Sequence, residues 1–283
     1  MGRDVMSELV EEVANSIGAA LDNDELDLPT LPEVALSIRE KADEDNVSAT
    51  TLSEVIGQDA GLSARIIKVA NSPMFRATAP IENLQMAVNR LGIDYAANLA
   101  TGLAMKQMFQ ATSDFIDRKI RAVWAQATKV AAVGATVAKH FTKLQPDHAS
   151  LAGLVHSIGV LPILGWAEEH DSAITDSFTL DQVIDALQGD IGVKILTAWD
   201  FPAEIRSVPA EFGNYYRPGA KADYVDVVTL AVLHTHRGSN HPSTMLDWSQ
   251  IGAFERTGVD TDFACLEEGD LANELEATSS AYA

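Results

Sequence analysis

The sequence of 283 residues contains 41 Asp and Glu but only 20 Lys and Arg, which gives a formal net charge of −21. Nucleic acids and anionic membrane surfaces attract proteins through clustered basic residues, so this charge argues against both as partners. The basic residues are scattered along the chain, and the nearest approach to a cluster, Arg118 to Arg121, follows two aspartates. We therefore predict no contact with nucleic acid and none with a membrane.

The composition is that of a globular protein without disulfides. Hydrophobic residues make up 47% of the chain and charged residues 22%, both ordinary values for a soluble domain. Aromatic residues make up only 6%, so the core must be mainly aliphatic, which favours helices at this alanine content. The single cysteine, Cys265, excludes an intramolecular disulfide and a cysteine-based zinc site. The acidic segment 1–27 has no signal-peptide pattern, and we expect a cytoplasmic protein.

Apolar residues recur every three or four positions through most of the chain, which predicts an all-α fold. In chain order, we expect helices over residues 4–21, 30–42, 48–57, 59–70, 81–91, 94–109, 117–141, 147–161, 180–187, 190–199 and 222–235. The 117–141 segment is the most regular, and its small residues would let the 147–161 helix approach closely. Residues 149–167 lack charged side chains, but their serines, histidine, glycines and proline favour a buried core helix over a membrane span.

Local signals mark several helix ends. Thr30 with Glu33, and Thr179 with Gln182, have the spacing of a capping box and are expected to begin helices. The Asn-Ser-Pro run at 71–73 is expected to end one, because asparagine tolerates the left-handed conformation and proline disfavours helical geometry at the preceding residue.

The last segment differs in kind from the rest. Residues 247–283 contain nine acidic residues and one basic residue, with only scattered apolar side chains. This pattern predicts a short helix at most and a mobile end. We expect removal of this segment to alter solubility more than specific partner binding.

Several short motifs occur in one order along the chain. They are LPTLP at 28–32, DAGLS at 59–63, VANS at 69–72, AV and LG at 87–88 and 91–92, Trp124, GLVHSIG at 153–159, IG at 191–192 and WDFP at 199–202. Together they resemble the bacterial HDOD domain, a relative of the HD metal-dependent phosphohydrolases.

The resemblance implies a multi-helix HDOD-type fold in two lobes. The smaller N-terminal lobe would cover about 28–108 and the larger HD-like lobe about 113–236. An acidic N-terminal helix and linker, 1–27, would precede this domain, and a loop and acidic extension, 237–283, would follow it. The family signature implies structural roles for Asp59, Leu62, Asn71, Ser72, Gly92, Trp124, Gly192, Trp199 and Pro202.

The chain departs from the catalytic HD pattern at its metal ligands. The HD enzymes hold a divalent metal through a neighbouring His and Asp, whereas this chain has His156-Ser157, and a serine hydroxyl is a weak ligand for a dication. Two other histidine positions of the family fall on Gln126 and Gln188. The resemblance therefore implies no catalytic residue, no metal site and no cofactor. His156 is better explained as a core histidine that a hydrogen bond satisfies.

Three functional hypotheses follow. The leading one is a non-catalytic bacterial signal-transduction or scaffold protein that binds other proteins of a signalling pathway, with a homodimer also possible. The alternatives are a phosphohydrolase with an altered ligand set and a metal-free nucleotide sensor that retains a vestigial pocket of Gln126, His156, Ser157 and Gln188. A second group consists of His234, His236 and His241 and could form a surface metal site. No carboxylate lies between its members, so we interpret the grouping as incidental and not as a metal site.

Overall fold

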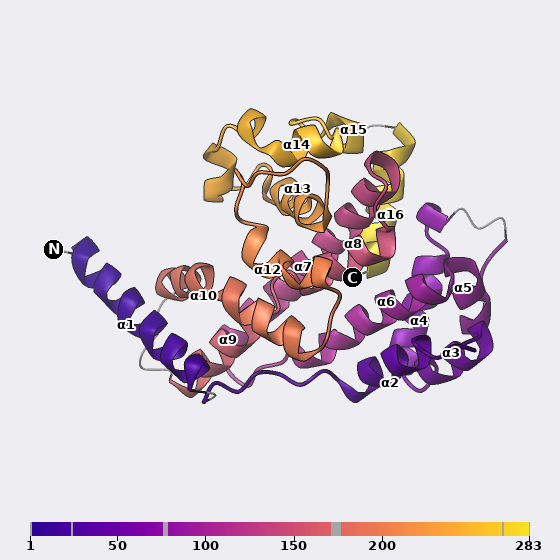
Figure 1. Ribbon diagram of the computed structural model, residues 1–283, viewed down its shortest axis with the longest axis horizontal. Coiled ribbons are helices and arrows are strands. Elements are labelled where there is room, and N and C mark those ends of the chain that lie inside the picture. Colours follow the sequence, from indigo (N-terminus) through magenta and orange to yellow (C-terminus); the bar gives the residue numbers. More distant parts are fainter. Residues whose placement is uncertain (1, 24, 76–78, 171–176, 268, 283) are drawn as a thin grey trace.

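The computed structural model describes residues 2–23, 25–75, 79–170, 177–267 and 269–282. Within these ranges there are sixteen α-helices, four short 3-10 helices and no strand, which confirms the predicted all-α fold (Figure 1). Apolar side chains from both halves of the chain join one buried core. The lobe boundaries predicted at residues 28, 108, 113 and 236 stay predictions.

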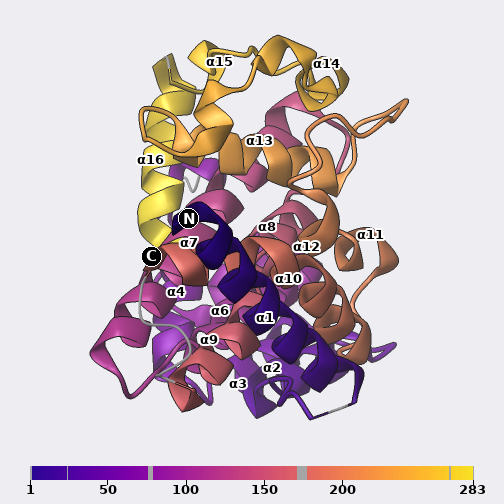
Figure 2. The same ribbon diagram turned by 90° about the vertical axis from the view of Figure 1, so that its left-hand side faces the viewer.

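The N-terminal helix lies apart from the elements that follow it in sequence. Helix α1 (Gly2–Asp22) packs on α10 (Ser177–Ala198), and the two lie side by side in both views (Figures 1 and 2). Its buried stripe includes Val13 and Ile17, as the periodicity predicts. The next helices gather at the other end of the molecule: α2 (Glu33–Ala42), α3 (Ala49–Ile56), α4 (Ala60–Ala70), α5 (Leu84–Leu91) and α6 (Ile93–Ala104), with the 3-10 helices η1 (Pro73–Phe75) and η2 (Met105–Met108).

The centre of the molecule is built on α7 (Asp114–Phe141), which packs against α8 (Pro146–Val155) and α13 (Tyr224–His236). The contact between α7 and α8 is closest at Gly153, where an added Cβ would lie 2.5 Å from Ala131 Cα. Only glycine fits such an approach, because real Cβ atoms do not come so near to backbone. The predicted close packing of these two segments is therefore confirmed.

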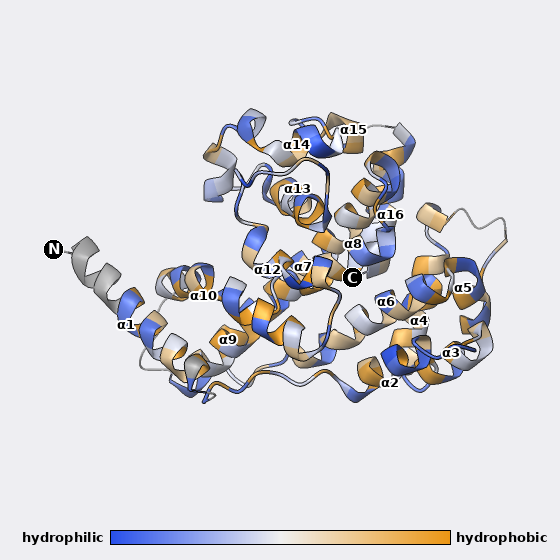
Figure 3. Ribbon diagram, in the orientation of Figure 1, coloured by the Kyte–Doolittle hydropathy of each residue, from blue (hydrophilic) through white to orange (hydrophobic). Residues whose placement is uncertain are grey.

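The helix predicted over 147–161 is interrupted. A turn at residues 156–159 separates α8 from α9 (Val160–Glu169). The segment Pro146–Glu169 is long and apolar enough to cross a membrane, but 89% of its most hydrophobic window is buried inside the protein. Figure 3 shows α9 as one of the most hydrophobic helices. This segment is the core of the fold, as the sequence predicts.

Two predicted helix ends are wrong, and a third, at Asn71, is right in position but not in geometry. The 180–187 and 190–199 segments form one helix, α10, and Thr179 lies inside it, fully buried. The Thr30 cap does not form, because Pro32, with ψ 140°, occupies the N-cap position of α2 without a side-chain hydrogen bond. Asn71 ends α4 in right-handed geometry, with φ −86°.

Short elements follow α10 and lead back to the core. They are α11 (Ala203–Arg206), α12 (Val208–Glu211), the 3-10 helices η3 (Pro242–Met245) and η4 (Trp248–Gln250), and α14 (Gly252–Thr257) and α15 (Ala264–Glu267). Helix α16 (Gly269–Tyr282) then packs on α7, η1 and α4. Tyr282 is fully buried, so the predicted mobile end is wrong: the acidic extension is part of the folded body up to this residue.

Candidate functional site

The vestigial HD pair lies at the turn between α8 and α9. His156 is 2% exposed, and its Nδ1 donates to the carbonyl oxygen of Gly153 at 2.7 Å. Its ring meets the ring of Phe212 edge-on at a centroid distance of 5.1 Å. Burial lowers the pKa of His156 to about 4, and the bond to Gly153 only partly opposes this change. The imidazole is therefore neutral at physiological pH and held in one orientation, as expected of a core histidine.

Gln126 connects α7 to α13. Its Nε2 lies 3.1 Å from Nε2 of His236. Burial, together with the nearby imidazoles of His241 and His156, lowers the pKa of His236 to about 4. Gln126, His156 and His236 thus form one polar group at the junction of three helices.

His241 extends the same group from the loop before η3. Its ring stacks on that of His236 at a centroid distance of 3.7 Å and an interplanar angle of 24°. Nδ1 of His236 lies 3.1 Å from the hydroxyl oxygen of Ser243, and Nδ1 of His241 lies 2.8 Å from the same oxygen. We refer to Gln126, His156, His236, His241 and Ser243 as the histidine cluster.

The sequence analysis grouped His234, His236 and His241, but the structure brings only His236 and His241 together. Residues 236 and 241 are brought together because the chain reverses after α13, which no periodicity indicates. His234 lies elsewhere, with its ring edge-on to Phe263 and its Nε2 3.6 Å from Glu267. The interpretation that these three histidines do not form a surface metal site stays a prediction.

The two remaining predicted pocket residues are less closely connected. Ser157 is 8% exposed, and its hydroxyl forms no hydrogen bond to any residue that the structure describes. Gln188 lies on α10, whose backbone crosses the 156–159 turn so closely that a Cβ on Gly159 would meet the Gln188 carbonyl oxygen. No contact joins the Gln188 side chain to the histidine cluster. Asp185, one turn earlier on α10, interacts electrostatically with His241 of the cluster. Burial lowers the pKa of His241, and the negative charge of Asp185 partly opposes this change.

The histidine cluster does not fit a divalent metal ion. A metal of the HD type needs several lone pairs that converge on one point, with carboxylates to offset its charge. Here two of the imidazoles are stacked face to face and share one hydroxyl, and Gln126 occupies a third direction. Among the described residues, no three His, Cys, Asp or Glu side chains are grouped to hold a metal. We therefore derive no metal-dependent step at this site.

Buried, neutral histidines make stability depend on pH. Unfolded histidines titrate near 6.5, whereas His156 stays neutral in the folded protein down to about pH 4. Between these values the unfolded state binds more protons, so the stability present above pH 6.5 is lost as the pH falls, by up to about 1.4 kcal/mol per pH unit. We expect the urea midpoint to fall from pH 7 to pH 5, and to fall less in His156→Gln. The control is His170→Gln, a change of an exposed histidine. If the urea midpoint of His156→Gln falls with pH as steeply as that of the wild type, His156 is not a neutral buried imidazole.

Several family-signature residues connect neighbouring elements of the first helical group. The Asp59 carboxylate caps α4 by accepting from the Leu62 amide at 2.9 Å. Asn71 donates to the Ile81 carbonyl and accepts from its amide, both at 2.8 Å, and so holds the loop before α5. Gly92 joins α5 to α6 with φ +87°, a conformation that other residues rarely adopt.

The other signature residues lie further along the chain. A Cβ on Gly192 would lie 2.6 Å from Cβ of Pro209, so α10 and α12 touch there. The Trp199 indole donates to the Pro29 carbonyl at 3.1 Å, and Pro202 is the N-cap residue of α11. Two signature residues have a buried polar atom without a partner among the described residues: Ser72 Oγ and Trp124 Nε1.

Comparison with solved structures places this arrangement among known folds. A structure from Shewanella amazonensis SB2B, described provisionally as a metal-dependent phosphohydrolase, is 30% identical, with a TM-score of 0.89 over 98% of this chain and 100% of that chain. A structure from Marinobacter aquaeolei VT8, described provisionally as a signal transduction protein, is 22% identical, with a TM-score of 0.62 over 92% of this chain and 60% of that chain. The second likeness shows the fold alone.

Sequence comparison agrees with the structural one. An uncharacterized protein of Treponema pallidum (strain Nichols) is 25% identical over 205 residues, which cover 69% of this chain and 38% of the relative, so the match spans well under half of that protein. The model of the HDOD domain matches residues 28–212, which include α2 to α12, the 156–159 turn and all nine signature residues. The chain therefore belongs to the HDOD family.

Proposed function

We propose that this protein is a non-catalytic regulatory protein of bacterial signal transduction that acts in the cytoplasm by binding another protein. The observation that carries the proposal is the state of the former catalytic position. There the imidazoles of His236 and His241 bond the same serine hydroxyl, and His156 is buried and neutral. Ser157, in place of an aspartate, supplies no carboxylate to offset the charge of a dication, and among the described residues no three His, Cys, Asp or Glu side chains are grouped to hold one.

Exposed apolar side chains beside the histidine cluster support a protein partner. Met245 is 88% exposed at the end of η3, two residues after Ser243. Tyr216 is 60% exposed and precedes α13. Large side chains of this kind anchor protein interfaces when a partner removes them from water. The Marinobacter neighbour's description as a signal transduction protein agrees with this role.

The phosphohydrolase alternative draws on the description of the Shewanella structure, and one experiment separates the two. We expect the purified full chain, supplied in turn with Mg²⁺, Mn²⁺, Fe²⁺, Ni²⁺ and Zn²⁺, to hydrolyse neither nucleotides nor bis(p-nitrophenyl) phosphate above the rate of the His156→Ala variant. Ser157→Asp, which restores the His-Asp pair, tests whether one substitution recovers metal binding, measured by elemental analysis. Metal-dependent hydrolysis by the wild type that His156→Ala abolishes would overturn the proposal.

The protein-binding half of the proposal has its own readout. Cross-linked complexes recovered from the native cell should depend on Met245 and Tyr216, so the Met245→Ser/Tyr216→Ser variant is expected to lose a complex that the wild type forms. Leu36→Ser, which changes an exposed leucine on α2, is the matched control. A complex that survives the double variant would place the interface elsewhere.

A further inference from the structure

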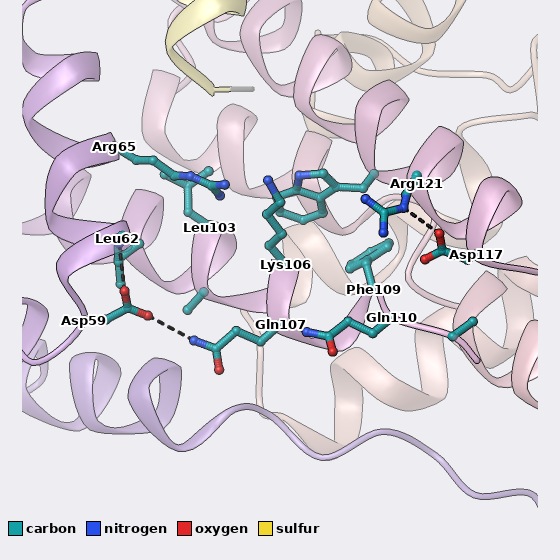
Figure 4. Close-up of a pocket in the computed structure, with 14 residues that line it drawn as sticks. Asp59, Leu62, Arg65, Leu103, Lys106, Gln107, Phe109, Gln110, Asp117 and Arg121 are labelled. Carbon is teal, nitrogen blue, oxygen red and sulfur yellow. Dashed lines mark hydrogen bonds and ion pairs between the residues drawn. The ribbon is translucent and has the colours of Figure 1, made fainter. Parts of the chain in front are cut away.

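A cavity of about 690 Å³ opens between α4, η2 and α7, away from the histidine cluster (Figure 4). Its volume lies within the range of roughly 300–1,000 Å³ that is usual for small-molecule sites. The buried side chains of Leu62, Leu103, Phe109 and Trp124 form its apolar wall. Segments far apart in the sequence thus enclose a hollow of ligand size.

Three basic side chains converge on this cavity from three different elements. Arg65 comes from α4, Lys106 from η2 and Arg121 from α7. In Figure 4, Arg65 and Arg121 reach toward Lys106 from opposite sides. Burial lowers the pKa of Lys106, and the charges of Arg65 and Arg121 lower it further. In a chain with a net charge of −21, this gathering of cations is the exception.

Two of these cations have no counter-ion among the residues that the structure describes. Among the described residues, no acceptor lies within hydrogen-bond distance of Arg65 or of Lys106. The two carboxylates that line the cavity are already engaged. Asp59 accepts from the Leu62 amide and from Gln107, and Asp117 accepts from Arg121 at 2.7 Å. The cavity therefore presents unpaired positive charge.

The indole of Trp124 adds an independent indication of a ligand. Trp124 is 6% exposed, and its Nε1 is buried without an acceptor, although the side chain lines the cavity. An unsatisfied buried donor costs about 1–3 kcal/mol, so a fold keeps one where a partner is supplied from outside. The ring of Phe109 lies 4.9 Å from it and completes an aromatic wall.

We infer that this cavity binds a small organic anion that carries a phosphate or carboxylate group on an aromatic ring. Guanidinium groups match the oxygens of such anions in geometry as well as in charge, and the apolar wall accommodates the ring. A long polyanion is disfavoured, because the remaining acidic surface repels it while a small ion is screened within about 8–10 Å. The inference goes beyond the proposed regulatory function and does not depend on it.

Calorimetric titration of the full chain tests the inference with defined probes. We expect phenyl phosphate and adenosine monophosphate to bind with dissociation constants below about 1 mM. Benzoate distinguishes a carboxylate site from a phosphate site. Adenosine, which lacks the anion, and inorganic phosphate, which lacks the ring, should each bind at least tenfold more weakly. If none of the ring-bearing anions binds below about 1 mM, the inference is wrong.

Variants show whether the binding is at this cavity. Arg65→Ala and Lys106→Ala should each weaken binding at least tenfold, whereas Arg118→Ala, a change of an exposed arginine on the same helix as Arg121, should leave it unchanged. Trp124→Phe keeps an aromatic ring but removes the N–H group. It should weaken the binding of the anion more than the binding of adenosine. Circular dichroism spectra that match the wild type show that each variant is folded. Binding that is unaltered in Arg65→Ala and Lys106→Ala would overturn the inference.

Discussion

Replacing Asp226 with alanine is expected to lower the free energy of unfolding by roughly 3–5 kcal/mol, the range for breaking a buried ion pair by removing one partner. The Asp226 carboxylate is fully buried on α13. It accepts from Arg217 at 2.6 Å and from Nε and Nη2 of Arg256 at 2.8 and 2.6 Å. The variant would leave two guanidinium groups largely out of water without their common counter-ion, which is why the expected effect is large.

The same ion group connects three segments that the sequence gives no reason to associate. Arg217 lies in the loop before α13, and Arg256 lies on α14, so Asp226 fixes both to the core. Asp226→Asn retains the shape but not the charge, and it should cost less than Asp226→Ala. Urea unfolding measures both variants. The control is Asp190→Ala, an exposed aspartate on α10, which should change stability by less than about 0.5 kcal/mol.

An apolar replacement of Asp226 and both arginines shows whether their ion pairs or their packing contributes more to the stability of the fold. The triple variant Asp226→Leu, Arg217→Met and Arg256→Met removes the buried carboxylate together with both arginines and leaves only half-exposed Asp223, which also pairs with Arg217. Exchanges of buried ion pairs for apolar side chains are often neutral or stabilising. We expect it to be more stable than Asp226→Ala alone. If Asp226→Ala unfolds at the urea midpoint of the wild type, Asp226 is not a buried counter-ion of the two arginines.

Helices could be predicted where one local rule acts alone. The apolar spacing of 117–141 placed α7, because its first half buries Ile120, Trp124 and Ala127 on one side, before residues 130–138 become buried all round. Local rules failed where tertiary contacts decide. Thr179 has the spacing of a cap, yet burial in the core extends α10 through it. Residues 156–159 continue the apolar run of α8, yet the close crossing of α10 at Gly159 accompanies a turn there.

The candidate sites show the same limit more strongly. His156 and Gln126 could be selected because a resemblance aligned them, but His241 joins them only through the reversal of the chain after α13. The basic cavity left no local trace. Arg65 and Lys106 stand alone in sequence and Arg121 lies near Arg118 and Lys119, so no sequence spacing brings these three side chains together. Charge counted along a sequence does not report charge gathered in space.

Replacing Tyr282 with alanine is expected to lower the free energy of unfolding by about 3–5 kcal/mol, the usual range for truncating a buried aromatic side chain. Tyr282 is fully buried at the end of α16, and its hydroxyl lies 2.9 Å from both the Tyr95 and the Ser150 hydroxyls. Burial raises the pKa of Tyr282, which keeps the phenol neutral. The variant would remove the packing and also leave two buried hydroxyls without this partner.

The structural role of α16 could not be predicted from its acidic composition. Figure 3 shows the helix as predominantly hydrophilic. Its one buried carboxylate, Glu274, is paired with Lys139 at 2.8 Å and lies 3.0 Å from His140, both on α7. Deleting residues 247–283 would therefore uncover the core, and loss of partner binding in such a truncation would report unfolding. The expectation that removal alters solubility more than specific partner binding stays a prediction, and this truncation cannot test it, because α16 packs on the core.

Point variants separate packing from hydrogen bonding at this position. Tyr282→Phe keeps the ring but removes the hydroxyl, so it should cost about 1–3 kcal/mol, less than Tyr282→Ala. Tyr216→Ala, at an exposed tyrosine, is the matched control and should stay within about 0.5 kcal/mol of the wild type. Urea midpoints measure all three. A Tyr282→Ala midpoint equal to that of the wild type would mean that α16 does not pack on the core in solution, since no buried aromatic side chain is lost without cost.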